Sequence, residues 1–188
     1  MAERPGRGRR TALWRLFPPS LALHRRPVGY LTQEPNLFPH LSVKENVCFA
    51  IQKNLRKDSA RTEWVAMLKD SLELAPIWEA SATRISGGQA RRVSLARMLA
   101  RRPRLVLLDE PFTGLDRQTV RELIETLLAW KAKLGFSMIA VDHQAEVLQR
   151  LCSRVLVLDQ GKVVQEGGWS ELYDRPANAL VRALVAPL

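Results

Sequence analysis

Residues 85–116 read ISGGQARRVSLARMLARRPRLVLLDEPFTGLD, and this stretch decides the fold class of the chain. Within it, the apolar run at residues 105–108 is followed at once by Asp109 and Glu110. A short, bounded run that is apolar on both faces is typical of a buried strand in a parallel sheet. Ligands bind open parallel sheets at the carboxyl ends of the strands, so the two carboxylates lie where a site is expected.

Asp109 and Glu110 are expected to have different tasks, because successive side chains of a strand point in opposite directions. One carboxylate can face a bound Mg²⁺, a cation that prefers carboxylate oxygens and water. The other can face an attacking water, as a base or as a group that orients it. The alternative is a pair of acids that cap a helix after the strand, and the two residues alone leave both possibilities open.

The sequence Ser86-Gly87-Gly88-Gln89 precedes an expected helix at residues 90–101. Two glycines let main-chain N–H groups approach an anion without a Cβ atom in the way, the serine adds a hydroxyl, and a helix presents its positive end there. We interpret the four residues as a phosphate cradle. An isolated S-G-G is often an ordinary helix N-cap, but the nearby strand with its two acids favours phosphate.

Other segments predict an alternation of strands and helices. Residues 136–141 and 155–158 resemble residues 105–108, and all three runs predict buried strands of a parallel sheet. An amphipathic helix is expected between the first two strands, with Asp116 capping its start and Gly135 ending it. The class is therefore α/β. Two shorter β signals complete this prediction: residues 28–32, which end at Gln33, and an antiparallel edge hairpin at residues 162–165 after a Gln160-Gly161 turn.

A mostly helical subdomain is expected at about residues 42–100. Ser42 and Glu45 have the spacing of a capping box, so a helix should begin there and run towards residue 52. A second helix at residues 60–74 places Trp64, Leu68 and Leu72 on one face. Near the other end of the chain, Ser170 is expected to open a terminal helical stretch.

Composition limits the classes of protein to consider. The chain has 188 residues, of which 46% are hydrophobic and 26% charged, typical of one soluble globular domain. The net charge is +10, but residues 1–30 hold seven arginines and one acid and so carry +6 of it. This distribution argues against nucleic-acid binding. The two cysteines are far apart and predict reduced thiols, and no apolar run approaches the roughly 20 residues that span a bilayer.

The motifs together carry a resemblance to a known family. From about residue 24 to its end, the chain resembles the ATP-binding cassette (ABC) ATPases. Residues 85–89 look like the family signature, with Ile85 in place of the usual leucine, and residues 105–109 look like the Walker B strand. Further matches are Glu110 with the catalytic glutamate, Asp116 of Gly114-Leu115-Asp116 with the D-loop, Gln33 with the Q-loop and His143 with the switch histidine.

This resemblance implies a P-loop NTPase-like parallel sheet core, with ATP and Mg²⁺ as cofactors. Asp109 and Gln33 would hold the metal, and Glu110 and His143 would be the catalytic residues. The remaining nucleotide contacts would come from Ser86, Gly87, Gly88, Gln89 and Asp116.

The partners and the location are also implied by the resemblance. ATP would be sandwiched between this chain and a second ABC cassette, in a homodimer or heterodimer. The Q-loop and the helical subdomain would meet an integral membrane permease, at the cytoplasmic face of the plasma membrane. The stretch HRRPVGYLTQEPNLFPHLSVKENV looks most like bacterial importer ATPases of the molybdate, thiamine, polyamine or ferric-ion kind.

One expected motif is absent from these residues. No G-x-x-x-x-G-K-[ST] loop occurs in the chain, and Gly161-Lys162 reads as a hairpin turn. We therefore expect a truncated ABC domain at residues 24–168, between an unstructured basic leader at residues 1–23 and a helical tail at residues 169–188. Two hypotheses remain: an importer ATPase that is defective alone, or a non-catalytic cassette that regulates or scaffolds an intact partner through its signature. A non-transport ABC protein of DNA repair or translation is a more distant alternative.

Overall fold

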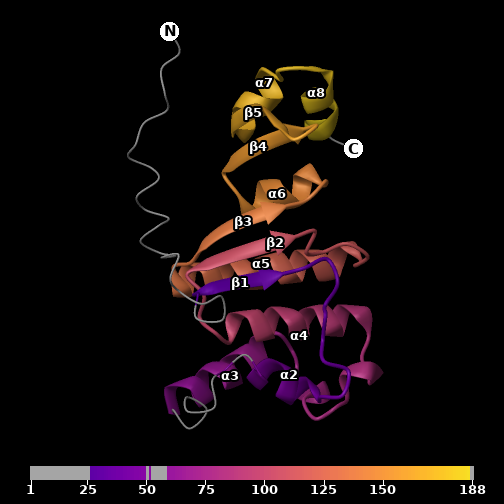
Figure 1. Ribbon diagram of the computed structural model, residues 1–188, viewed down its shortest axis with the longest axis vertical. Helices are drawn as coiled ribbons and strands as arrows, with labels where there is room; N and C mark the ends of the chain where they lie inside the picture. The colour runs from indigo at the N-terminus through magenta and orange to yellow at the C-terminus, as the bar shows by residue number, and fades with distance from the viewer. Residues whose placement is uncertain (1–25, 50, 52–58, 187–188) are drawn as a thin grey trace.

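A computed structural model describes residues 26–49, 51 and 59–186. The expected basic leader, and the predicted end of the first helix near residue 52, lie outside these residues. Within them, an α/β arrangement is present: a small parallel sheet with helices against one face, a helical region at one end of the molecule and a hairpin with two short helices at the other (Figure 1). The predicted fold class is confirmed.

The central sheet has three parallel strands in the order β1-β2-β3. They are β1 (Val28–Leu31), β2 (Leu105–Asp109) and β3 (Ser137–Val141). The register pairs Tyr30 with Leu107 and Asp109 with Val141. Parallel pairing brings the carboxyl ends of all three strands to one edge of the sheet, which is where Asp109 ends β2 and Glu110 follows it.

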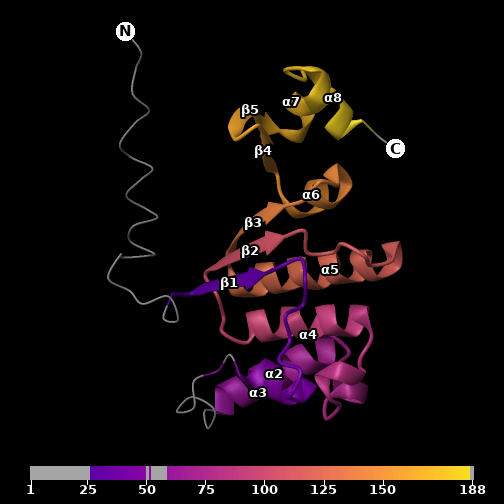
Figure 2. The same ribbon diagram turned by 45° about the vertical axis from the view of Figure 1, so that its right-hand side comes forward.

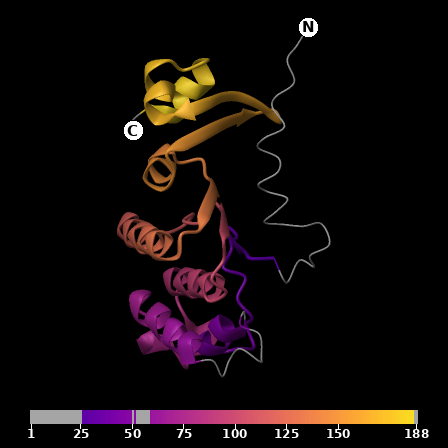
Figure 3. The same ribbon diagram turned by 90° about the vertical axis from the view of Figure 1, so that its left-hand side faces the viewer.

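Two helices cover one face of this sheet. They are α4 (Gly87–Leu99) and α5 (Arg117–Leu134), and Figure 3 shows both on the same side of the strands. The contact of β1 with α4 is very close, since a Cβ atom at Gly29 would lie 2.5 Å from Cγ of Met98. Alternate strand residues supply the buried layer, among them Leu31, Val106 and Leu108.

The ends of α5 follow the sequence signals. Asp116 caps the helix by accepting a hydrogen bond from the Thr119 N–H, and Gly135 ends it in the left-handed conformation with φ 67°. The apolar stripe of the helix buries Leu123, Ile124 and Leu127 in the main core. Both predicted helix boundaries are confirmed.

The helical region consists of α2 (Val43–Phe49), α3 (Ser59–Ser71) and the adjoining α4, with 3-10 turns η3 (Ala75–Ile77) and η4 (Ala82–Arg84) between them. The predicted capping box is present, because Glu45 N–H donates to Ser42 Oγ and Ser42 N–H donates to Glu45 Oε2. Trp64, Leu68 and Leu72 are all buried, as their spacing predicted, although α3 ends one residue before Leu72. The subdomain boundaries at residues 42 and 100 remain predictions.

The prediction of residues 155–158 as a strand of the parallel sheet is wrong. β4 (Arg154–Asp159) pairs with β5 (Lys162–Gly168) in a separate antiparallel two-stranded sheet. β4 follows β3 through α6 (Ala145–Leu151), as Figure 2 shows, yet no pairing joins β3 to β4 among the described residues. An apolar run of four residues identifies a strand but not its neighbour, because pairing is decided by distant segments. The predicted hairpin is confirmed, with Gln160 and Gly161 both at positive φ.

The prediction that the strands are buried on both faces is also wrong. Ile139 and Val141 on β3 are 55% and 59% exposed, and Tyr30 on β1 points to the same uncovered face. On β4, Leu156 and Leu158 are exposed as well. The described helices therefore cover only one side of an apolar sheet.

The remaining segments pack around the hairpin. They are α7 (Trp169–Asp174), which begins one residue before the predicted Ser170, and α8 (Ala179–Val185). Both pack on it through a small core of Val157, Leu172, Val181 and Val185. Among the described residues, Cys48 and Cys152 form no disulfide bond. None of the helices in the described part of the chain is long and apolar enough to cross a bilayer.

Candidate functional site

Three strand ends bring the predicted site residues to one edge of the sheet. Gln33 follows β1, Asp109 ends β2 with Glu110 next to it, and His143 follows β3. The sequence alone gives no distance between these residues. The parallel register brings these residues to the same edge, because β1, β2 and β3 end at the same level of the sheet.

Asp109 has a partner that the sequence analysis did not identify. The phenol of Tyr30 donates a hydrogen bond to Asp109 Oδ2 at 2.9 Å. This hydrogen bond, together with partial burial and the carboxylate charge, raises the pKa of Tyr30 above its ordinary value. Tyr30 pairs with Leu107, two residues before Asp109, so both side chains lie on the uncovered face of the sheet.

Glu110 is held by different groups from those that hold Asp109. Its N–H donates to the Val141 carbonyl at 2.9 Å, and its backbone has φ 41°, an unusual conformation for a residue with a Cβ atom. Thr113 Oγ1 donates to Glu110 Oε2 at 3.3 Å, and His143 Nδ1 lies 3.7 Å from Glu110 Oε1. The two neighbouring carboxylates thus have separate partners, and the separate tasks expected for them remain a prediction.

The signature residues form a capped helix start. Ser86 Oγ accepts from the Gln89 N–H at 3.2 Å, and Gln89 Oε1 accepts from the Ser86 N–H at 2.9 Å, which together make a capping box. A Cβ atom at Gly87 would meet no other atom within 4 Å, so this turn faces open space. The ordinary N-cap considered from the sequence is present. The additional phosphate role of these residues stays a prediction.

Asp116 lies beside the signature. Its Oδ1 accepts from the Thr119 N–H at 2.9 Å, and its Oδ2 accepts from the Thr119 hydroxyl at 2.6 Å. These hydrogen bonds hold the pKa of Asp116 below its ordinary value, and the bond from the hydroxyl has the larger effect. A Cβ atom at Gly88 would lie 3.9 Å from Thr119 Cγ2. The D-loop aspartate and the signature glycines are therefore adjacent, at the starts of α5 and α4.

Gln33 is held through its main chain. Arg91 on α4 donates to the carbonyls of both Thr32 and Gln33, and Arg97 donates to the Pro35 carbonyl at 3.0 Å. These arginines were not among the predicted site residues. The signal that could have identified them is their spacing of three residues on one helix with Ser94, which also donates to the Pro35 carbonyl. In the described residues no hydrogen bond joins the Gln33 side chain to Asp109, so their joint role as metal ligands remains a prediction.

The side chains near Asp109 fit Mg²⁺ only if waters and substrate phosphates supply its other ligands. Within the part of the chain that the structure describes, no group of three or more His, Cys, Asp and Glu side chains could hold a metal ion. Mg²⁺ is commonly bound by one or two carboxylates, with waters and substrate phosphates as its other ligands. Asp109, which the Tyr30 phenol orients, fits the role of the single carboxylate in such a site.

A comparison with family models gives a match to the ABC transporter family over residues 9–113. The match covers more than half of the chain and includes the signature, Asp109 and Glu110. The chain belongs to the ABC transporter family.

Individual relatives agree with this family membership. The chain is 34% identical over 166 residues to the methionine import ATP-binding protein MetN of Cupriavidus pinatubonensis, covering 88% of this chain and 48% of that protein. It is 42% identical over 161 residues to the Fe(3+) ions import ATP-binding protein FbpC of Pseudomonas fluorescens, covering 83% and 44%. It is 39% identical over 155 residues to the thiamine import ATP-binding protein ThiQ of a Jannaschia species, covering 82% and 68%.

A solved ABC structure supports the fold directly. The cbiO1 protein of Clostridium perfringens, part of the ABC transporter complex cbiONQ, matches with a TM-score of 0.70 and 27% identity. The match covers 84% of this ABC chain and 62% of that one. The chain spans about half the length of the methionine and iron import proteins it matches.

Proposed function

We propose that this chain is the ATP-binding subunit of an ABC importer and acts together with a second cassette and a membrane permease. The observation that carries the proposal is the convergence of Asp109, Glu110 and His143 at one sheet edge, beside a capped signature helix. The import proteins among its relatives support the same role. The work of such a subunit would take place at the cytoplasmic face of the plasma membrane.

Each residue would contribute a distinct step to ATP hydrolysis. When bound, Mg²⁺ neutralises charge on the phosphates, and Asp109 and Gln33 would hold it. Glu110 would orient a water and accept its proton, while His143 would donate a hydrogen bond to the terminal phosphate. The N–H groups at Gly87 and Gly88, the Ser86 hydroxyl and the amide of Gln89 would bind phosphate from the partner cassette's nucleotide, with Asp116 beside them.

We further propose that the two sites of the assembly differ. Residues 1–188 contain no G-x-x-x-x-G-K-[ST] loop, and the lysine and main-chain N–H groups of such a loop supply much of the grip on phosphates. The site that contains Glu110 would therefore be inactive when these residues act alone. The signature does not need that loop, because it serves the nucleotide of the partner. The alternative, a regulatory cassette without catalysis of its own, is favoured by the same missing loop.

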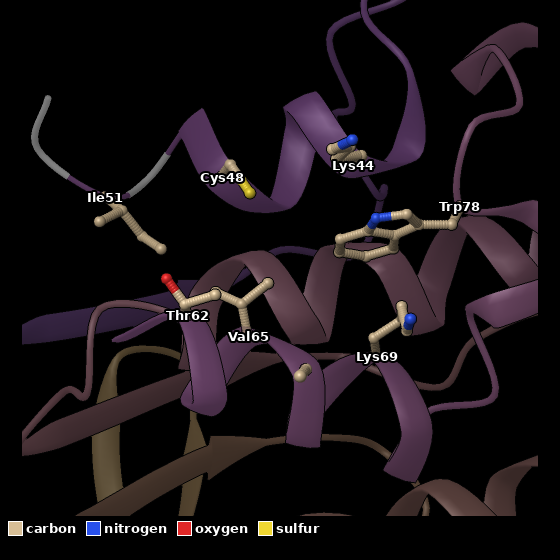
Figure 4. Close-up of a pocket in the computed structure, with 8 residues that line it drawn as sticks. Lys44, Cys48, Ile51, Thr62, Val65, Lys69 and Trp78 are labelled. Atoms are coloured by element: carbon tan, nitrogen blue, oxygen red, sulfur yellow. The ribbon is translucent and has the colours of Figure 1, made fainter. Parts of the chain in front are cut away.

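We propose that the permease contacts the helical region near a cavity of about 330 Å³ between α2 and α3. Figure 4 shows its lining, which includes Cys48 and Val65, with the side chain of Trp78 across one end. Lys44 and Lys69 also line it, and Lys69 Nζ lies 5.9 Å from the centre of the Trp78 ring. Lys44 already pairs with Glu79 at 3.0 Å, so Lys69 is the cation that suits an amphipathic segment carrying an acidic residue.

ATP hydrolysis by defined mixtures tests the proposal. We expect the 188-residue chain alone to show no hydrolysis above buffer, and a mixture with an intact importer cassette and its permease to hydrolyse ATP. Ser86→Ala should lower the rate of the mixture at least tenfold. Ser42→Ala, which removes the equivalent cap from the helical region, should leave that rate within about twofold. If the chain alone hydrolyses ATP and Glu110→Gln abolishes that hydrolysis, the proposed difference between the two sites is wrong.

A further inference from the structure

His143 lies between two carboxylates. Its Nδ1 is 3.7 Å from Glu110 Oε1 and also 3.7 Å from Asp142 Oδ1. These are the carboxylates within ion-pair distance of His143 in the described residues, one from the end of β2 and one from the end of β3. Both lie on the Nδ1 side of the ring. The sequence motifs drew attention to Glu110 and His143 but not to Asp142.

Asp142 is better shielded from solvent than Glu110. Its side chain is 2% exposed, compared with 34% for Glu110 and 61% for His143. The Gln144 N–H donates to Asp142 Oδ1 at 2.9 Å, which fixes the carboxylate at the start of α6. Charges that are shielded from solvent interact more strongly than exposed ones, because water and salt screen them less. The carboxylate that acts most strongly on His143 Nδ1 should therefore be Asp142.

We propose that Asp142 is a positioning residue that keeps the proton of His143 on Nδ1. The two ring nitrogens of histidine are distinct, and the group that faces one of them decides which nitrogen carries the proton. A carboxylate on the Nδ1 side stabilises Nδ1–H and leaves Nε2 for a different partner. At 3.7 Å the contact is electrostatic, and hydrogen bonds at catalytic sites often shorten only when substrate binds.

The consequence for function depends on the proposed role of His143 at the terminal phosphate. A neutral ring with its proton on Nδ1 presents an unprotonated Nε2. When a phosphate approaches, Nε2 takes a proton from solvent and can donate to the phosphate, while the two carboxylates stabilise the resulting imidazolium through Nδ1–H. Asp142 would thus prepare the histidine without touching the nucleotide.

Nitrogen NMR of His143 in the 188-residue chain tests this inference without any ATPase measurement. The chain has three histidines, so a His143→Gln variant assigns the signal. In the neutral ring, we expect Nδ1–H to be the majority tautomer in the wild type. In Asp142→Ser, which keeps an oxygen to cap Gln144 but removes the charge, Nδ1–H should fall below half.

Each outcome decides the proposal. A wild-type ring with its proton mainly on Nε2 would overturn it, whether or not any variant folds. The proposal would also be overturned if the Asp142→Ser chain is folded, as judged by circular dichroism, and Nδ1–H remains its majority tautomer. If Asp142→Ser does not fold, the shape-matched Asp142→Asn replaces it, with the same majority tautomer as the criterion. Because the readout is the tautomer, a failure of the proposed ATPase role leaves this test unaffected.

Discussion

Arg91, on the helix that begins at the signature, donates hydrogen bonds to the main-chain carbonyl of Gln33, 58 residues earlier in the chain. Its side chain is almost fully buried, and it also donates to the neighbouring carbonyl of Thr32. Burial lowers the pKa of Arg91 from its ordinary value, but a guanidinium stays charged at neutral pH. The Q-loop backbone and α4 are therefore held together by a buried cation.

Arg91→Ala should destabilise the fold by about 1–3 kcal/mol, because the carbonyls of Thr32 and Gln33 lose a partly buried donor. The matched control is Arg92→Ala on the same helix turn, where the lost ion pairs are to the exposed carboxylates of Glu73 and Glu122. That change should cost less than about 1 kcal/mol. Urea unfolding followed by tryptophan fluorescence measures both. Equal losses for the two variants would show that the link from α4 to the Q-loop contributes nothing of its own.

Gly29→Ala should destabilise the chain by about 1–3 kcal/mol, the usual cost of an extra group in a packed core. The added Cβ atom would lie 2.5 Å from Met98 Cγ and 3.2 Å from Pro103 Cγ, so the Met98 side chain, α4 or β1 must shift. The control is Gly87→Ala, which meets no atom within 4 Å. We expect Gly87→Ala to leave the denaturation midpoint unchanged or slightly raised, because alanine favours helix. A Gly29→Ala chain as stable as the wild type would contradict the close packing of β1 on α4.

The uncovered face of the sheet should limit solubility. Ile139 and Val141 are exposed on β3, and contiguous apolar surface of this kind promotes association. Replacing both by threonine keeps a β-branched side chain and should raise the concentration at which the chain stays monodisperse, with little change in stability. Val106→Thr on the covered face of β2 is the control, and it should destabilise the chain by about 1–3 kcal/mol, the cost of a buried hydroxyl without a partner. Light scattering and urea unfolding distinguish the two effects. Equal effects would mean that both faces are covered in solution.

Asp116 should contribute stability that depends on pH. Hydrogen bonds from Thr119 lower its pKa in the folded chain, so its contribution is present above the unfolded pKa of about 3.9 and is lost as the pH falls through the folded value. Thr119→Val removes the hydroxyl donor and keeps the N–H donor. In that variant the pKa of Asp116 should rise towards its ordinary value, as measured by NMR titration of the carboxyl carbon. No rise would show that the hydroxyl does not hold the carboxylate.

Local sequence determined most of the individual elements. The run that became β2, the Ser42–Glu45 and Ser86–Gln89 capping boxes, the Asp116 cap and the Gly135 stop all depend on side chains within a few residues of one another. Such short-range geometry does not require the rest of the fold. The order of the motifs by itself likewise indicates the family, and the family match agrees.

Only the tertiary structure decided which of these elements meet. It placed β4 with β5 rather than beside β3, and it left one apolar face of the sheet uncovered by the described helices. It also brought Tyr30 to Asp109, Arg91 to Gln33 and Asp142 to the same ring nitrogen as Glu110. The first two of these contacts join residues more than fifty positions apart, and the third depends on where β2 ends beside β3. Strand pairing and helix packing set such distances, and neither is encoded in the spacing of a motif.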